Sequence, residues 1–307
     1  MSEDLIHRFS FVEAPIRGQW VRLEAVLGEL FRRQPYPERL RGLLAEMAAA
    51  VSLMADNVKF HGAVSLQARG SGPVTTALAE CRDQHLLRGL LRWDEDHAAP
   101  PEAAAGGLRA LLGSGQMAIT LMPEPTAAQR RRGAEATTYQ GVVAVDEGSL
   151  AENLEEYFAN SEQLPTRVFF SYAAGRVTGL LLQRLPAADA ASDVELDQHD
   201  ESWRAIDLLA STLSPAELAT LPVQDLLRRL FHEHPLTLQP ARPLAFSCTC
   251  SRERAERMLQ ALPKQEIIEL LETQGMVDVT CEICGARYEY DQVDTHLIYE
   301  PGEPRIH

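Results

Sequence analysis

Basic residues and long hydrophobic runs are both scarce in this sequence. It has 29 Lys and Arg against 44 Asp and Glu, which gives a formal net charge of −15. A negative surface field repels phosphate, so we expect neither nucleic acid nor an anionic membrane among the partners. The best apolar stretch, residues 47–55, lies between Glu46 and Asp56 and falls far short of the ~20 residues that span a bilayer.

A secretory signal and the common catalytic motifs are also absent. Residues 1–4 (MSED) have acids where a signal peptide carries bases, so we expect a cytoplasmic protein, in which thiols stay reduced. The sequence has no P-loop or G-x-S-x-G elbow, and its G-x-G at 70–72 indicates only a turn. We interpret His232 and His234 as exposed and Cys81 as a small buried side chain. We therefore expect no catalytic residues and no enzyme.

The rest of the composition is that of an ordinary globular protein, with 45% hydrophobic and 24% charged residues. Residues 1–187 mix helix and strand patterns, which favours an α+β core domain. Apolar residues recur with a 3.6-residue period over residues 37–58, which predicts a long helix. The other predicted elements are strands around residues 64–68, 116–122, 138–145, 168–171 and 177–183, and a helix over residues 146–161.

Residues 188–245 are predicted to form a helical linker. Residues 186–201 are rich in Ala and Asp and predict an exposed connector. Ser214 and Glu217 have the spacing of a capping box, with proline at the first helical position, so a short helix begins there. Residues 223–232 predict a second helix. Such short, charged helices hold their structure only when docked on another surface, so we expect the linker to be metastable.

Residues 246–307 are predicted to form a small C-terminal module of two helices and a hairpin. The helices are expected over residues 252–262 and 264–273, with Gly275 as a C-terminal cap, and the strands over residues 276–281 and 287–291. A module of this size buries too little apolar surface to be stable without a cross-link.

Four of the five cysteines lie in this module, with the spacing C-x-C, thirty intervening residues, C-x-x-C: Cys248, Cys250, Cys281 and Cys284. Two such pairs can place four thiolates at the corners of a tetrahedron, the geometry that zinc takes at ~2.3 Å from each sulfur. We therefore expect one zinc ion in the reduced state, with no open position for a catalytic water. Zinc keeps the sulfurs as thiolates, which are the oxidisable form. Four arginines lie near the cysteines in the sequence: Arg252, Arg254, Arg257 and Arg287. They either stabilise the charged thiolate form of the cysteines or form a solvated face.

The cysteine motifs belong to a wider resemblance. Five short strings occur in a fixed order along the chain. They are VKFHG (58–62), YQGVV (139–143), SEQLPT (161–166), CTCSRER (248–254) and VTCEIC (279–284). In these strings the chain resembles, over nearly its whole length, the redox-regulated holdase chaperones of the heat-shock protein thirty-three family.

The resemblance implies a mechanism and a set of partners. The reduced form would hold zinc and be inactive. Oxidants such as peroxide would join Cys248 to Cys250 and Cys281 to Cys284, release zinc and loosen the linker. The oxidised protein, generally a dimer, would then hold unfolding client proteins without ATP and pass them to ATP-dependent foldases.

Two other functions remain open. One is a binding module whose zinc is permanent and purely structural. The other is a thiol–disulfide oxidoreductase that uses Cys281 and Cys284, although such motifs usually open a helix, whereas here Gly285 and a predicted strand follow.

Overall fold

The computed structural model describes residues 4–95, 107–133, 136–145, 148–186 and 193–299. The chain divides into two compact units, Met1–Ser247 and Cys248–His307, which are described separately. Among the described residues, no helix is both long and apolar enough to cross a bilayer.

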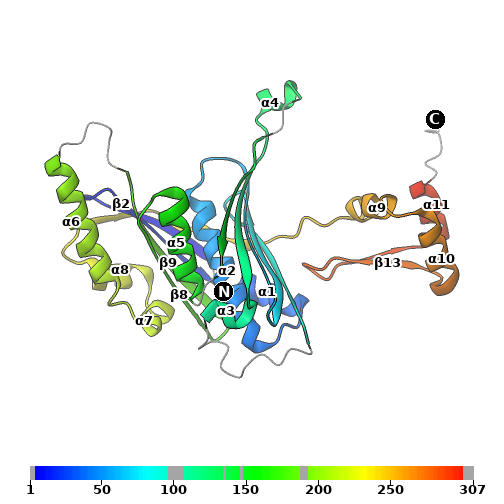
Figure 1. The fold of residues 1–307 in the computed structure, drawn as a ribbon, viewed down its shortest axis with the longest axis horizontal. Coiled ribbons are helices and arrows are strands. Elements are labelled where there is room, and N and C mark those ends of the chain that lie inside the picture. The colour runs from blue at the N-terminus through cyan, green and yellow to red at the C-terminus, as the bar shows by residue number, and fades with distance from the viewer. Residues whose placement is uncertain (1–3, 96–106, 134–135, 146–147, 187–192, 300–307) are drawn as a thin grey trace. The chain divides into compact units, whose positions relative to one another are not determined.

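The first unit contains two six-stranded sheets (Figure 1). In the first sheet the order is β10-β1-β2-β9-β8, with β11 also paired to β1. Its strands are β1 (Leu5–Phe11), β2 (Ile16–Leu23), β8 (Thr166–Ala173), β9 (Arg176–Arg184), β10 (Leu236–Leu238) and β11 (Arg242–Pro243). In the second sheet the order is β12-β5-β4-β3-β6-β7. Its strands are β3 (Gly62–Gly70), β4 (Val74–Arg82), β5 (Leu86–Trp93), β6 (Gly115–Pro123), β7 (Tyr139–Ala144) and β12 (Ala245–Phe246).

Helix α2 (Glu38–Asn57) is the centre of this unit and packs against strands of both sheets (Figure 1). From Met47 to Asp56 every residue is buried, because a helix between two sheets needs apolar residues on all sides. The smaller helices of this unit are α1 (Ala25–Arg33), α3 (Gly107–Leu112), α4 (Ala127–Arg131) and α5 (Leu150–Tyr157). Helix α4 lies away from α2, at the far end of the extension formed by β6 and β7 (Figure 1). The α+β class is confirmed.

Most elements predicted in this unit are present, and α2 agrees with its prediction to within one residue at each end. Strands β1, β2, β4 and β5 were not predicted, because their apolar and polar residues do not alternate cleanly. The helix predicted over residues 146–161 is α5 followed by a π-helical turn, Phe158–Glu162. Ser149 and Glu152 form a capping box at its start, and residues 146–147 lie outside the described residues.

Three helices cover the other face of the first sheet: α6 (Asp193–Ala210), α7 (Pro215–Thr220) and α8 (Val223–Phe231). Helix α8 buries Leu226, Leu230 and Phe231 in a cluster with Phe9, Phe11 and Trp20 of the sheet. Helix α7 begins at Ser214 with the predicted capping box and Pro215 at its first position. The helices after residue 213 are therefore held by a continuous apolar interface.

The prediction of an exposed connector over residues 186–201 is wrong from residue 193 onward, where α6 begins. Its acids are not merely solvated. Asp200 pairs with Arg184, and Asp207 pairs with Arg167 at 3.0 Å. A run of acids suggests an exposed segment in a sequence, but here Arg184 of β9 gives one acid of the run, Asp200, a partner on the sheet.

A cavity of about 220 Å³ lies where α7 meets the core, lined in part by Glu46, Phe170, Pro215 and Leu218. Burial raises the pKa of Glu46 to about 7. The folded protein therefore keeps this proton at pH values where the unfolded chain, with a carboxyl pKa of 4.5, has lost it. Consequently, stability falls as the pH rises between these two values, and the full penalty applies above about pH 7.

Glu46→Gln is therefore expected to raise the free energy of unfolding by about 2 kcal/mol at about pH 8 and to change it little at about pH 4. Urea denaturation at both pH values measures this difference. The matched control is Glu38→Gln, on the same helix, whose side chain is 76% exposed. An equal change at both pH values would contradict the assignment to Glu46.

The second unit consists of α9 (Arg252–Gln260), α10 (Lys264–Gln274), a hairpin of β13 (Val277–Thr280) and β14 (Arg287–Tyr290), and α11 (Gln292–Tyr299). Gly275 ends α10 in the left-handed region, with φ +75°, as predicted. The prediction of only two helices is wrong, because α11 follows the hairpin. Its first turn is held by the Asp291 carboxylate, which accepts from the amides of Val293 and Asp294.

Candidate metal centre

The four clustered cysteines lie on two loops of the second unit. Cys248 and Cys250 lie in the extended segment before α9, whose N-cap is Ser251. Arg254, on the first turn of α9, donates to the carbonyl and hydroxyl oxygens of Thr249. The helix therefore fixes the loop that carries the first cysteine pair.

Cys281 and Cys284 lie in the tight turn between β13 and β14. The Cys281 amide donates to the Ala286 carbonyl at 2.8 Å, and the Gly285 amide donates to the Cys281 carbonyl at 2.7 Å. Gly285 has φ +68°, a conformation that a residue with Cβ rarely adopts. This turn directs both sulfurs to the same side, as the C-x-x-C spacing predicts.

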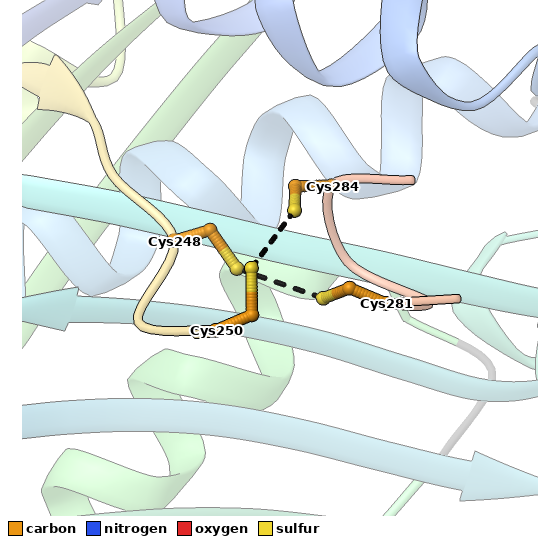
Figure 2. Close-up of side chains that lie close together, drawn as sticks. All are labelled: Cys248, Cys250, Cys281 and Cys284. Atoms are coloured by element: carbon orange, nitrogen blue, oxygen red, sulfur yellow. Dashed lines mark hydrogen bonds between the residues drawn. The ribbon is translucent and has the colours of Figure 1, made fainter. Parts of the chain in front are cut away.

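The four sulfurs point toward one another (Figure 2) and all lie within 4.8 Å. The Sγ–Sγ distance is 3.7 Å between Cys248 and Cys281, and 3.3 Å between Cys250 and Cys284. A zinc ion at ~2.3 Å from four sulfurs would set the tetrahedron edges at about 3.8 Å. The donor set therefore fits a tetrahedral, sulfur-preferring metal such as zinc, and small adjustments would complete the geometry.

Tyr288 is a neighbour of the cluster that the cysteine spacing did not indicate. Its hydroxyl donates to the Cys250 sulfur at 3.2 Å. Burial raises the pKa of Cys250, but hydrogen bonds from Tyr288 and the neighbouring thiols more than offset this and lower it to about 7. Burial raises the pKa of Cys284, and the neighbouring thiols add to this effect. The only signal in the sequence is the alternation of Tyr288 and Tyr290, which places both on one face of β14.

Two of the nearby arginines pair with carboxylates. Arg252 pairs with Asp294 at 2.9 Å and lies over the ring of Tyr290 at 4.4 Å. Arg287 pairs with Asp278 across the hairpin. Their contacts fasten α9, the hairpin and α11 together around the cysteine loops.

Comparison with known proteins gives the family. The family model described as "Hsp33 protein" matches residues 4–291. A "33 kDa chaperonin" of Pseudomonas savastanoi pv. phaseolicola is 38% identical over 300 residues, 97% of this chain and 94% of that protein. The chain belongs to the Hsp33 family. Another "33 kDa chaperonin", from Shewanella loihica, is 36% identical over 98% of this chain and 97% of that protein.

A solved Hsp33-family structure agrees in fold. The crystal structure of the "33 kDa chaperonin (Heat shock protein 33 homolog)" from Thermotoga maritima matches with a TM-score of 0.80. The match covers 97% of this chain and 98% of that one, at 20% identity. The family resemblance seen in the sequence motifs is therefore confirmed.

The SEQLPT motif of this Hsp33-family chain has a structural role. It ends the π-helical turn, and Gln163 takes the left-handed conformation with φ +55°. The Leu164 amide then donates to the Phe158 carbonyl, and Thr166 accepts from Gln183 of β9 at 3.0 Å. The motif thus joins α5 to β8 and sets the register of the sheet edge.

The remaining candidate residues lie apart from the cysteine cluster. Cys81 is fully buried in the core of the first unit, and burial raises the pKa of its thiol to about 12. His232 is 67% exposed at the end of α8, as expected, and His234 is half-buried. Cys81 is therefore a packing residue in this Hsp33-family fold, as its isolation in the sequence predicted.

Proposed function

We propose that this chain is a redox-regulated holdase chaperone that works without ATP and is not an enzyme. The observation that carries the proposal is the set of four mutually close cysteine sulfurs in a chain of the Hsp33 family. In the reduced state Cys248, Cys250, Cys281 and Cys284 would hold one zinc ion. When bound, zinc would fix the two cysteine loops together and keep the sulfurs as thiolates.

The proposed switch oxidises the four thiols to two disulfides, Cys248–Cys250 and Cys281–Cys284. Two thiolates that join in a disulfide give two electrons to one peroxide molecule, which takes two protons from solvent and is reduced to two molecules of water. After both disulfides have formed, the zinc would leave as Zn²⁺, since no thiolate remains to hold it. In the folded unit the sulfur contacts at 3.7 and 3.3 Å join residues of different loops. Once the metal is lost and the unit loosens, cysteines two or three positions apart stay close, whereas pairs more than thirty residues apart separate. Local pairing is therefore favoured.

The proposed consequence is release of the linker, residues 188–245, from the core domain, residues 1–187. The apolar interface of α8 with the first sheet supports this idea, because it would be exposed on release. Unfolding proteins in the cytoplasm would then bind there and on the core. In this proposal the oxidised protein is a dimer and passes its clients to ATP-dependent foldases.

Light scattering of a thermally unfolding client tests the proposal. We expect suppression of aggregation by protein oxidised with warm peroxide, little by the zinc-loaded reduced protein, and loss of suppression after reduction with zinc present. Disulfide mapping by mass spectrometry checks the pairing, and metal analysis identifies the ion. Equal suppression by both forms would mean that the zinc is structural, and no suppression by either would reject the chaperone function.

A further inference from the structure

Residues 236–247 form a strap between the two sheets of the first unit. Strands β10 and β11 of the strap pair with β1 of the first sheet, and β12 pairs in parallel with β5 of the second sheet. These three strands have only 3, 2 and 2 residues. The strap ends at Ser247, which directly precedes Cys248 in the sequence. It therefore connects the linker helices to the cysteine module through short pairings.

Main-chain and side-chain contacts hold the strap along its length. The amides of Leu244, Ala245 and Ser247 each donate at 2.9 Å to a carbonyl of the core, on Asp4, His85 and Leu87 respectively. The Leu244 side chain is buried in the main core. The Gln239 amide also donates to the Arg8 carbonyl at 2.8 Å, and Phe246 packs against the main core beneath the Arg33 guanidinium. Leu236 and Leu238 pack against the cluster that contains α8. The strap is therefore held by many contacts, each of modest strength.

The strap also makes an ion pair at the end of α2. The Asp56 side chain is fully buried and contacts two guanidinium groups, from Arg8 of β1 and Arg242 of the strap. Arg8 also donates to the Asp56 carbonyl at the carboxyl end of the helix, where the helix dipole favours cations. A buried carboxylate needs such partners, because it has no water to solvate it.

Arg242 also contacts the second sheet. It donates to the Gln84 side chain at 3.0 Å, and Gln84 donates in turn to the Val58 carbonyl at 2.9 Å. Gln84 lies in the β4–β5 turn in the left-handed conformation, with φ +65°. Arg242 thus joins the strap to α2 and to the second sheet. The planar guanidinium can serve both partners at once, which an ammonium group does less well.

We propose that Arg242 is a positioning residue of the switch: its ion pair with Asp56 holds the strap on the core and must break before the strap can leave. The effect of Arg242 on activation rests on the proposed function. The contact between Arg242 and Asp56 does not, because both residues belong to the first unit. Loss of Arg242 leaves Asp56 paired with Arg8, so the core keeps its fold while the strap loses its ionic contact.

The test is hydrogen exchange of the full-length, reduced, zinc-loaded protein carrying Arg242→Met. The amides of Leu244, Ala245 and Ser247 are expected to exchange about ten-fold faster than in the original protein. Arg242→Lys is expected to restore part of the protection. The matched control is Arg228→Met on α8, whose side chain is 78% exposed and pairs only loosely with Asp225.

A second readout is the half-time of activation by warm peroxide in the client assay, which should shorten several-fold for Arg242→Met and not for the control. Unchanged exchange at the three strap amides would overturn the proposal. It would also be overturned if the amides of α2 and β3 exchanged faster by the same factor as the strap amides, because Arg242 would then stabilise the whole core rather than the strap. If strap exchange is faster in Arg242→Met but neither protein ever suppresses aggregation, the role of Arg242 in holding the strap stands and only the chaperone function is rejected.

Discussion

Cys281→Ser is expected to abolish stoichiometric zinc binding and to unfold residues 248–299 in the otherwise reduced protein. Among residues 248–299 the hydrophobic cluster contains six buried residues, whereas four thiolates bind zinc with an apparent free energy of about 10–16 kcal/mol. A serine hydroxyl does not replace a thiolate ligand at neutral pH. Metal analysis of the purified variant, with hydrogen exchange over α9 to α11, measures both effects.

Cys81→Ala is the matched control for this experiment, because Cys81 is a cysteine outside the cluster and buried in the first unit. It should keep one zinc per chain and an ordered second unit, with at most a modest loss of core stability. A full zinc content in Cys281→Ser would refute the four-cysteine site. Loss of zinc with an unchanged second unit would show that the unit does not depend on its metal.

Phe231→Ala is expected to free α8 from the first sheet without removing the metal. The Phe231 side chain is 1% exposed and meets Phe11 edge-to-face, with ring centroids 5.2 Å apart. Deleting such a ring from a packed core costs about 3–5 kcal/mol. If the linker covers the client-binding surface, the zinc-loaded reduced variant should suppress client aggregation in the light-scattering assay and bind a hydrophobic dye.

Leu208→Ala is the matched control, since Leu208 lies on α6 and is 71% exposed; it should behave like the original protein. Hydrogen exchange in β3 distinguishes local release of α8 from unfolding of the whole unit. Release of α8 with no gain in client suppression would contradict the idea that the docked linker keeps the protein inactive.

Several parts of the fold could be predicted because their determinants are local in sequence. The helical period of α2, the capping box at Ser214 and the αL cap at Gly275 each depend on neighbouring residues. The acids of α6 were misinterpreted because their partners, Arg167 and Arg184, come from distant strands. Helix α11 was missed because its start depends on one Asp side chain rather than on a clear apolar period.

The sequence by itself indicated which four cysteines come together, because C-x-C and C-x-x-C confine each sulfur pair to one short loop. It also indicated the family, through motifs in a fixed order. Only the tertiary structure decided which side chains complete these features. Tyr288 reaches Cys250 through the hairpin register, and Arg242 reaches Asp56 because the strap returns to β1. The physical reason is that a buried charge or thiol is stabilised by whichever partners the fold brings within hydrogen-bond distance, and local spacing does not encode that choice.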